Sequence, residues 1–152
     1  MSDTDARAFR RAVVALNGGP SDSRIVHLVA DQAARTKAEL IGVHVVEIDW
    51  TLPLDADIAS RSEDVQRILD VAEGIAESHK QRMEPVLLQA RDVGAAIVDE
   101  ATERKADLLV VGLPYRKRFG GEFAIGLTIP YILQNAPCQV WVVREPMSEE
   151  PS

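Results

Sequence analysis

An unbroken apolar run from Ala12 to Leu16, followed at once by Asn17-Gly18-Gly19-Pro20, constrains this chain more than any other feature. A strand that is apolar at every position has both of its faces covered, which is typical of a parallel sheet with helices on each side. The tetrapeptide that follows, rich in glycine and proline, predicts the turn that ends the strand. The pattern therefore predicts an α/β fold.

Strand-like and helix-like segments alternate along the rest of the chain. Short β-branched runs predict further strands, and apolar residues at intervals of three and four predict amphipathic helices. The predicted strands are 12–16, 39–47, 85–90, 107–111 and 139–144, and the predicted helices are 21–36, 65–83, one opening at Asp92 or Val93, and one that Thr128 caps and Pro137 stops. Ser21 and Ser23 are the predicted capping residues of the first helix.

Alternation of this kind builds right-handed βαβ units. We therefore expect one doubly wound, five-stranded parallel sheet with strand order 3-2-1-4-5 and helices on both faces, a Rossmann-like arrangement. Both ends of the chain are polar, and residues 145–152 combine two prolines with three glutamates. We expect flexible tails at 1–10 and 145–152 around a single domain at 11–144.

The charge balance narrows the classes of partner. The formal net charge of −7 repels nucleic-acid backbones and anionic membrane surfaces, so we expect no nucleic-acid partner. No apolar run is long enough to cross a bilayer, the first residues lack the apolar stretch of a secretory signal, and the single cysteine, Cys138, cannot form an internal disulfide. These features predict a cytoplasmic protein with no membrane insertion.

Catalytic and metal-binding patterns are missing from the sequence. His27, His44 and His79 have no cysteine or carboxylate at ligand spacing, and no Gly-x-Ser-x-Gly elbow presents a nucleophile. Cys138 follows a proline and enters a strand, which suits packing better than chemistry. We therefore predict that the protein is not an enzyme and holds no metal of its own.

The segment 112–128 is punctuated by glycines and leads into a helix. Glycines let backbone N–H groups approach an anion, and a helix N-terminus favours negative charge. The segment lies where the strand order reverses, between the first and fourth predicted strands, and ligands of open α/β sheets bind at that crevice. The residues that predict a phosphate site are Gly112, Gly120, Gly121, Gly126 and Thr128. The alternative, that the glycines only serve tight turns, stays open, as does the choice between charge compensation and simple solvation for Arg116-Lys117-Arg118.

Longer stretches resemble a known family. The residues 106–112 (ADLLVVG), Gly126 and 135–143 (NAPCQVWVV) are similar to the C-terminal half of the universal stress protein family, and 43–47 (VHVVE) is similar to its first half. The resemblance covers roughly residues 11–144. It implies the adenine-nucleotide alpha-hydrolase-like fold, a regulatory role, and ATP or another adenine nucleotide as the ligand.

Nucleotide-binding members of that family carry glycine, two residues, glycine, nine residues, then glycine and serine or threonine. Gly112 matches the first glycine and Gly126 the last, but Tyr115 stands at the second glycine and ten residues separate it from Gly126. Leu127 occupies the hydroxyl position, with Thr128 one residue later. Members that lack the pattern bind no ATP.

The first half of the family contributes residues around the base and ribose. Asn17, followed by Gly18, stands where nucleotide binders carry an acidic residue, and Ala15 and Val45 match positions that contact the base. An amide still forms hydrogen bonds there, although it carries no charge. Strand-core packing is the alternative role for Ala15 and Val45.

The resemblance also implies partners. Family members commonly form homodimers through their final strands, here 140–143, and a strand this apolar at a sheet edge calls for a cover. The C-terminal tail is the alternative cover. Stress-protein domains appended to amino-acid permeases are similar to residues 115–144, which implies a transporter as partner. Two other functions stay open, a nucleotide-independent interaction module and a slow phosphate-anhydride hydrolase, for which no general base is visible.

Overall fold

The computed structural model describes residues 8–51, 53, 63–113 and 126–147. Strands and helices alternate along the described chain, as the sequence predicts. In chain order they are β1 (Arg11–Leu16), α1 (Ser21–Thr36), β2 (Glu39–Glu47), α2 (Glu63–Ser78), β3 (Met83–Ala90), α3 (Val93–Glu103), β4 (Leu108–Leu113), α4 (Thr128–Asn135) and β5 (Gln139–Arg144).

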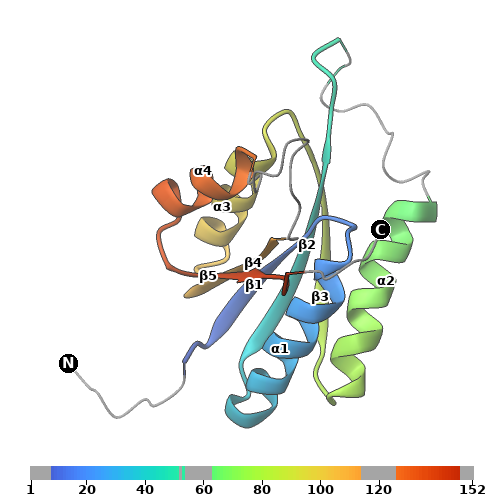
Figure 1. Ribbon diagram of the computed structural model, residues 1–152, viewed down its shortest axis with the longest axis vertical. Helices are drawn as coiled ribbons and strands as arrows, with labels where there is room; N and C mark the ends of the chain where they lie inside the picture. The colour runs from blue at the N-terminus through green and yellow to red at the C-terminus, as the bar shows by residue number, and fades with distance from the viewer. Residues whose placement is uncertain (1–7, 52, 54–62, 114–125, 148–152) are drawn as a thin grey trace.

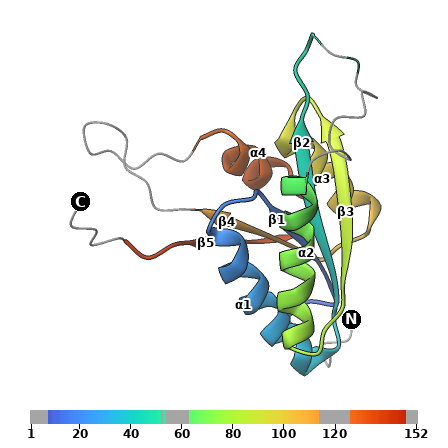
Figure 2. The same cartoon turned by 90° about the vertical axis from the view of Figure 1, so that its right-hand side faces the viewer.

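The strands form one five-stranded sheet in the order β3-β2-β1-β4-β5, and every neighbouring pair is parallel. This confirms the predicted doubly wound topology. Helices α1 and α2 cover one face of the sheet, and α3 and α4 cover the other (Figures 1 and 2). Strand β1 lies at the centre, so the strand order reverses between β1 and β4.

Two apolar layers explain the unbroken run in β1. Ala12, Val14 and Leu16 pack into the layer beneath α1 and α2, whereas Val13 packs into the layer beneath α3 and α4. Side chains alternate between the faces of a strand, so a strand covered on both sides must be apolar throughout.

Within the described residues, no helix is both long and apolar enough to cross a membrane.

Helix α1 approaches β4 closely where Ser21 meets Gly112. A Cβ atom built on Gly112 would lie 2.6 Å from the Cβ of Ser21, so only glycine fits there. Ser21 is buried, and its hydroxyl donates a hydrogen bond to Glu145 Oε2 at 3.1 Å. The predicted serine cap is therefore wrong, because Pro20 is the N-cap of α1 and no side chain caps it.

The other boundaries differ from the prediction by a few residues. Helix α2 ends at Ser78 and not near Met83, because Lys80 adopts a left-handed φ of 61° and Gln81 N–H bonds back to Ala76 O at 2.9 Å. Met83 instead opens β3.

The packed body also extends beyond the predicted limits of 11–144. Phe9 is 1% exposed, and its ring meets that of Trp141 edge to face at 5.6 Å. At the other end Glu145 N–H bonds to Leu113 O at 2.8 Å. Residues on both sides of the predicted boundary therefore belong to the packed structure.

Candidate functional site

A cleft of about 540 Å³ opens at the carboxyl ends of β1, β2 and β4, between the sheet and the helices α3 and α4. This is the crevice where the strand order reverses, the place where open α/β sheets bind ligands. The residues around it are Ala15, Leu16, Asn17, His44, Val45, Glu47, Val93, Ile97, Val111, Gly112, Leu113, Gly126, Thr128, Ile129 and Ile132.

Most of the predicted site residues lie around this cleft together. Six of them line it, namely Ala15, Asn17, Val45, Gly112, Gly126 and Thr128. Gly18 instead lines a smaller hollow of about 310 Å³ between α1 and α2. Gly120 and Gly121, with the basic run 116–118, lie outside the described residues. Whether any of these residues touches a ligand stays a prediction.

One wall of the cleft is apolar. Ala15, Val45 and Val111 supply it from three adjacent strands, because these residues point to the face that α3 and α4 cover. Ile97 and Ile132 close it from the helices. A flat apolar wall with a few polar groups at its rim is the usual form of a small-molecule site.

The rim carries a histidine that the sequence analysis did not select. His44 Nδ1 lies 2.8 Å from Leu16 O. A carbonyl oxygen can only accept, so Nδ1 carries a hydrogen and Nε2 is the ring nitrogen left for another partner. The parallel register places His44 opposite Leu16. Its position near the carboxyl end of a predicted strand is the only sequence signal that could have indicated it.

Asn17 is held by the turn that it begins. Its Oδ1 accepts a hydrogen bond from Gly19 N–H at 2.7 Å, so the side chain closes a turn on its own backbone. Its NH₂ group forms no hydrogen bond with another described residue, and Asn17 lines the cleft. An acidic residue at this position would have no such donor.

Asp22 accepts hydrogen bonds from two backbone N–H groups of the same turn. Its carboxylate accepts from Asn17 N–H at 3.0 Å and from Gly18 N–H at 2.8 Å. Burial raises the pKa of Asp22 above its ordinary value, an effect larger than the opposing pull of the two N–H groups and of the nearby His44. These two amides are therefore already satisfied by the protein and are not available to a bound anion.

The N-terminus of α4 offers such donors. Thr128 is the first residue of the helix and not its cap, because Leu127 is the N-cap and no side chain caps the helix. The first backbone N–H groups of a helix have no partner within the helix, and they bind anions readily. Gly126, just before them, has a φ of 84° and open space around its Cα.

No group of three or more histidine, cysteine, aspartate or glutamate side chains is placed to hold a metal ion in the part of the chain that the structure describes. The cleft combines the apolar wall with the N-terminus of α4, an arrangement that suits an organic anion with an apolar part.

Comparison with known proteins identifies the family. The model of the universal stress protein family matches residues 8–144. The chain belongs to the universal stress protein family. This confirms the family predicted from the sequence, and the fold is the one that universal stress proteins share.

The individual relatives share less than a third of their residues with this chain. The sensor protein KdpD of Mycobacterium tuberculosis is 29% identical over 145 residues, which are 95% of this chain but only 16% of KdpD. The chain thus spans about a sixth of that relative. A universal stress protein solved in complex with cAMP is 24% identical, with a TM-score of 0.66 over 90% of this chain and 97% of the other. The universal stress protein of Archaeoglobus fulgidus in complex with dAMP is 22% identical, with a TM-score of 0.67 over 88% and 97%.

Proposed function

We propose that this universal stress protein binds an adenine nucleotide in the cleft at the carboxyl ends of β1, β2 and β4, and acts as a nucleotide-responsive regulator. The observation that carries the proposal is the cleft itself, which brings Ala15, Asn17, Val45, Gly112 and Gly126 around one space of about 540 Å³. That volume lies within the range of small-molecule sites. The complexes of two universal stress proteins with cAMP and dAMP support the choice of ligand.

The two sides of the cleft suit the two parts of a nucleotide. An adenine ring packs on the apolar wall of Ala15 and Val45, where its burial is favourable. Asn17 and His44 stand at the rim, where their polar groups can meet the ribose and the base edge.

The phosphates belong at the start of α4. The amides of the β1–α1 turn are occupied by the carboxylate of Asp22, whose charge also repels an anion. The uncapped N-terminus of α4 lies on the other side of the cleft beside Gly126. This placement is compatible with a monophosphate, a cyclic phosphate or ATP, and Mg²⁺ would enter with a triphosphate.

Calorimetry with ATP, ADP, AMP and cAMP tests the proposal. We expect saturable heat with at least one of them and a loss of binding in Gly126→Asp, which places a negative charge beside the phosphates. Gly74→Asp is the matched control, because Gly74 lies in α2 with no atom within 4 Å of a Cβ at that position. Absence of saturable heat for all four ligands in the wild-type protein would sink the proposal.

The same material distinguishes two other functions. A hydrolase would release product over many turnovers, and Gly126→Asp would abolish that release. An interaction module would retain its protein partner regardless of nucleotide. We place the protein with the regulators, and its likeness to a sensor protein supports a sensing role. A transporter as the regulated partner and a cytoplasmic location stay predictions.

A further inference from the structure

The amino-terminal edge of the sheet, at the opposite end of the strands from the cleft, gathers cationic side chains. In a parallel sheet the connections that lead from each helix into the next strand meet at this edge. Arg10 and Arg11 lie at the start of β1, Lys37 precedes β2, Lys80 and Arg82 precede β3, and Arg104 and Lys105 precede β4. We call these residues the cationic edge. It stands out in a chain whose formal net charge is −7.

Three lysines of the cationic edge share an unusual backbone conformation. Lys37, Lys80 and Lys105 have φ angles of 58°, 61° and 55°, and they are the non-glycine residues with positive φ in the described chain. Each follows the last turn of a helix, where Gly or Asn normally adopts this conformation at lower cost. All three side chains are exposed.

The helix dipole does not account for this choice. A cation anywhere in the last turn of a helix interacts favourably with the dipole, as Arg35 of α1 does without a left-handed backbone. Glycine at the three positions would remove the strain and close the helices equally well. The repeated use of lysine at three separate helix ends, all meeting at one edge, indicates that the charge itself is needed.

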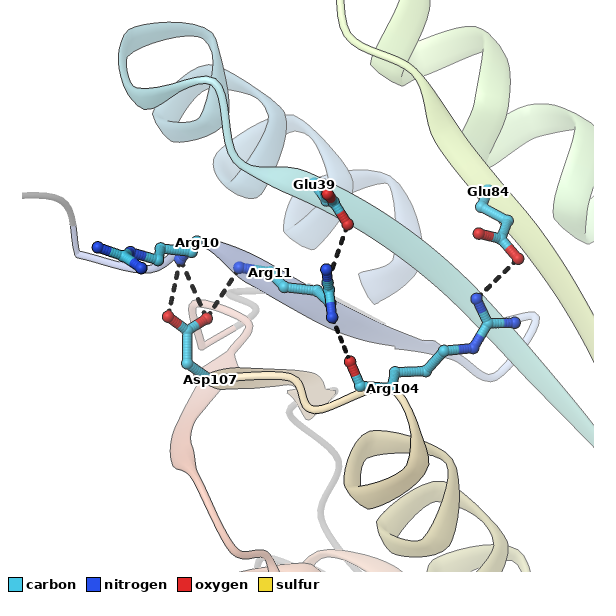
Figure 3. Close-up of polar contacts among 6 residues, drawn as sticks. All are labelled: Arg10, Arg11, Glu39, Glu84, Arg104 and Asp107. Atoms are coloured by element: carbon cyan, nitrogen blue, oxygen red, sulfur yellow. Dashed lines mark hydrogen bonds and ion pairs between the residues drawn. The ribbon is translucent and has the colours of Figure 1, made fainter.

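The carboxylates of this edge are already engaged (Figure 3). Arg11 Nε binds Glu39 at 2.8 Å, and Arg104 binds Glu84 at 2.8 Å. Asp107 accepts from the backbone N–H groups of Arg10 and Arg11 at 2.8 to 3.0 Å.

The ammonium groups of the lysines are not engaged in this way. No hydrogen bond or ion pair joins Lys37, Lys80 or Lys105 through its side chain to another described residue. Glu39 and Glu84 are thus paired with arginines and Asp107 is held by backbone N–H groups, whereas the lysine charges face solvent.

Two shallow hollows lie among these lysines. One, of about 630 Å³, is lined by Lys37, Lys80 and Arg82 together with Glu39 and Glu84, and the other, of about 480 Å³, is lined by Arg10, Arg11, Lys37 and Lys105 together with Glu39 and Asp107. Lys37 and Glu39 line both hollows, so the two are neighbours.

We propose that the cationic edge docks an acidic segment of a partner protein, with Lys37, Lys80 and Lys105 as its principal contacts. A nucleic acid fits less well, because carboxylates are interleaved with the cations and the net charge is negative. The exposed aromatic side chains of the described residues, Trp50 and Tyr131, belong to other segments and offer no stacking platform among the lysines. A membrane also fits less well. The connections that carry these lysines contain none of the exposed large apolar side chains of the described chain, so their described residues supply no apolar group for insertion. Those side chains are Leu28, Trp50, Val71, Leu127, Tyr131, Leu133, Val142 and Met147.

The test uses the full chain and a fluorescent peptide of about 15 residues, half of them glutamate, titrated by anisotropy at low and at high salt. We expect saturable binding that weakens at least about tenfold as the salt rises from about 0.02 M to about 0.3 M. A single-stranded DNA oligonucleotide and vesicles containing phosphatidylserine are titrated beside it and should bind more weakly than the peptide. Absence of saturable peptide binding at low salt, or tighter binding of the DNA or the vesicles, overturns the proposal.

The decisive variant replaces Lys37, Lys80 and Lys105 with glycine together. It should lose at least about tenfold in peptide affinity, and its Tm should stay the same or rise, because glycine adopts positive φ without strain. The matched control, Arg24→Gln with Arg67→Gln and Arg144→Gln, removes the same charge from other segments and should keep the affinity. Unchanged affinity in the glycine variant, an equal loss in the control, or a lower Tm of the glycine variant contradicts the proposal.

Discussion

The carboxylate of Asp22 accepts a hydrogen bond from the backbone N–H of Gly18 at 2.8 Å. A carboxylate in the first turn of helix α1 therefore occupies a backbone donor of the turn that precedes the helix. A second bond, from Asn17 N–H at 3.0 Å, completes the arrangement. Sequence patterns favoured this glycine turn as part of a ligand site. The structure uses its amides internally.

The raised pKa of Asp22 predicts a pH dependence of stability. At pH values between the pKa of 3.8 in the unfolded chain and the higher pKa in the folded protein, the folded state binds more protons than the unfolded state. The free energy of unfolding therefore falls as the pH rises through this window. Asp22→Asn cannot titrate. We expect the stability of the wild-type protein relative to this variant to decrease as the pH is raised from 3.8, measured by urea unfolding at several pH values. An increase would mean that the two N–H bonds outweigh burial.

The contact between Gly112 and Ser21 predicts a costly substitution. Gly112→Ala brings two Cβ atoms to 2.6 Å, and the strand and the helix must separate to relieve the overlap. We expect a loss of about 1 to 3 kcal/mol in the free energy of unfolding, the usual cost of overpacking. Gly74→Ala is the control, since it meets no atom within 4 Å in a helix and should gain about 0.5 to 1 kcal/mol. Equal effects of the two substitutions in urea unfolding would contradict the close contact.

A larger apolar side chain on the apolar wall of the cleft tests the position of the adenine ring without adding charge. Ala15→Leu places three more carbon atoms where we expect the adenine ring, so nucleotide affinity in calorimetry should fall at least about tenfold. Ala136→Leu adds the same atoms at a partly buried position against the same apolar layer but away from the cleft. If Ala15→Leu retains nucleotide affinity and has a Tm close to that of the control, the adenine ring does not pack against Ala15.

The outer strand β5 predicts the oligomeric state. Among the described residues it pairs with β4 alone, and Val142 on it is 37% exposed. An apolar edge strand needs a cover, and we expect a second copy to supply it through residues 140–143. Sedimentation should show a dimer that Val142→Lys converts to a monomer. Val71→Lys on α2, where the valine is 48% exposed, should leave the dimer intact. A monomeric wild-type protein would favour a cover from the chain's own C-terminal residues.

The sheet order could be predicted because its signal is local. An apolar run such as Ala12 to Leu16 requires cover on both faces, and alternating helices supply that cover in only a few right-handed arrangements. The helix caps were harder to predict. Ser21 has the side chain of a capping residue, yet it turns inward to Glu145, which lies more than a hundred residues along the chain. Such a contact leaves no local signal.

The candidate site was predicted in part for a similar reason. Topology alone predicted where the cleft lies, at the carboxyl ends of the strands where the strand order reverses. Ala15 and Val45 were assigned to it by the resemblance to the universal stress protein family. His44 was overlooked because its bond to Leu16 O depends on the register between two strands. The left-handed lysines were also invisible, since the sequence shows the residue type but not the φ angle that makes Lys37 unusual.

Strand β1 runs between the two surfaces proposed here, with Arg11 at the cationic edge and Asn17 just beyond its other end at the cleft. It has a paired strand along each side, and Ala12, Val13 and Val14 have no exposed surface. Amide protons in such a strand exchange with solvent only when the whole domain opens. The cleft and the cationic edge therefore belong to one cooperative unit. A nucleotide that slows amide exchange in β1 would slow exchange at the distant cationic edge as well.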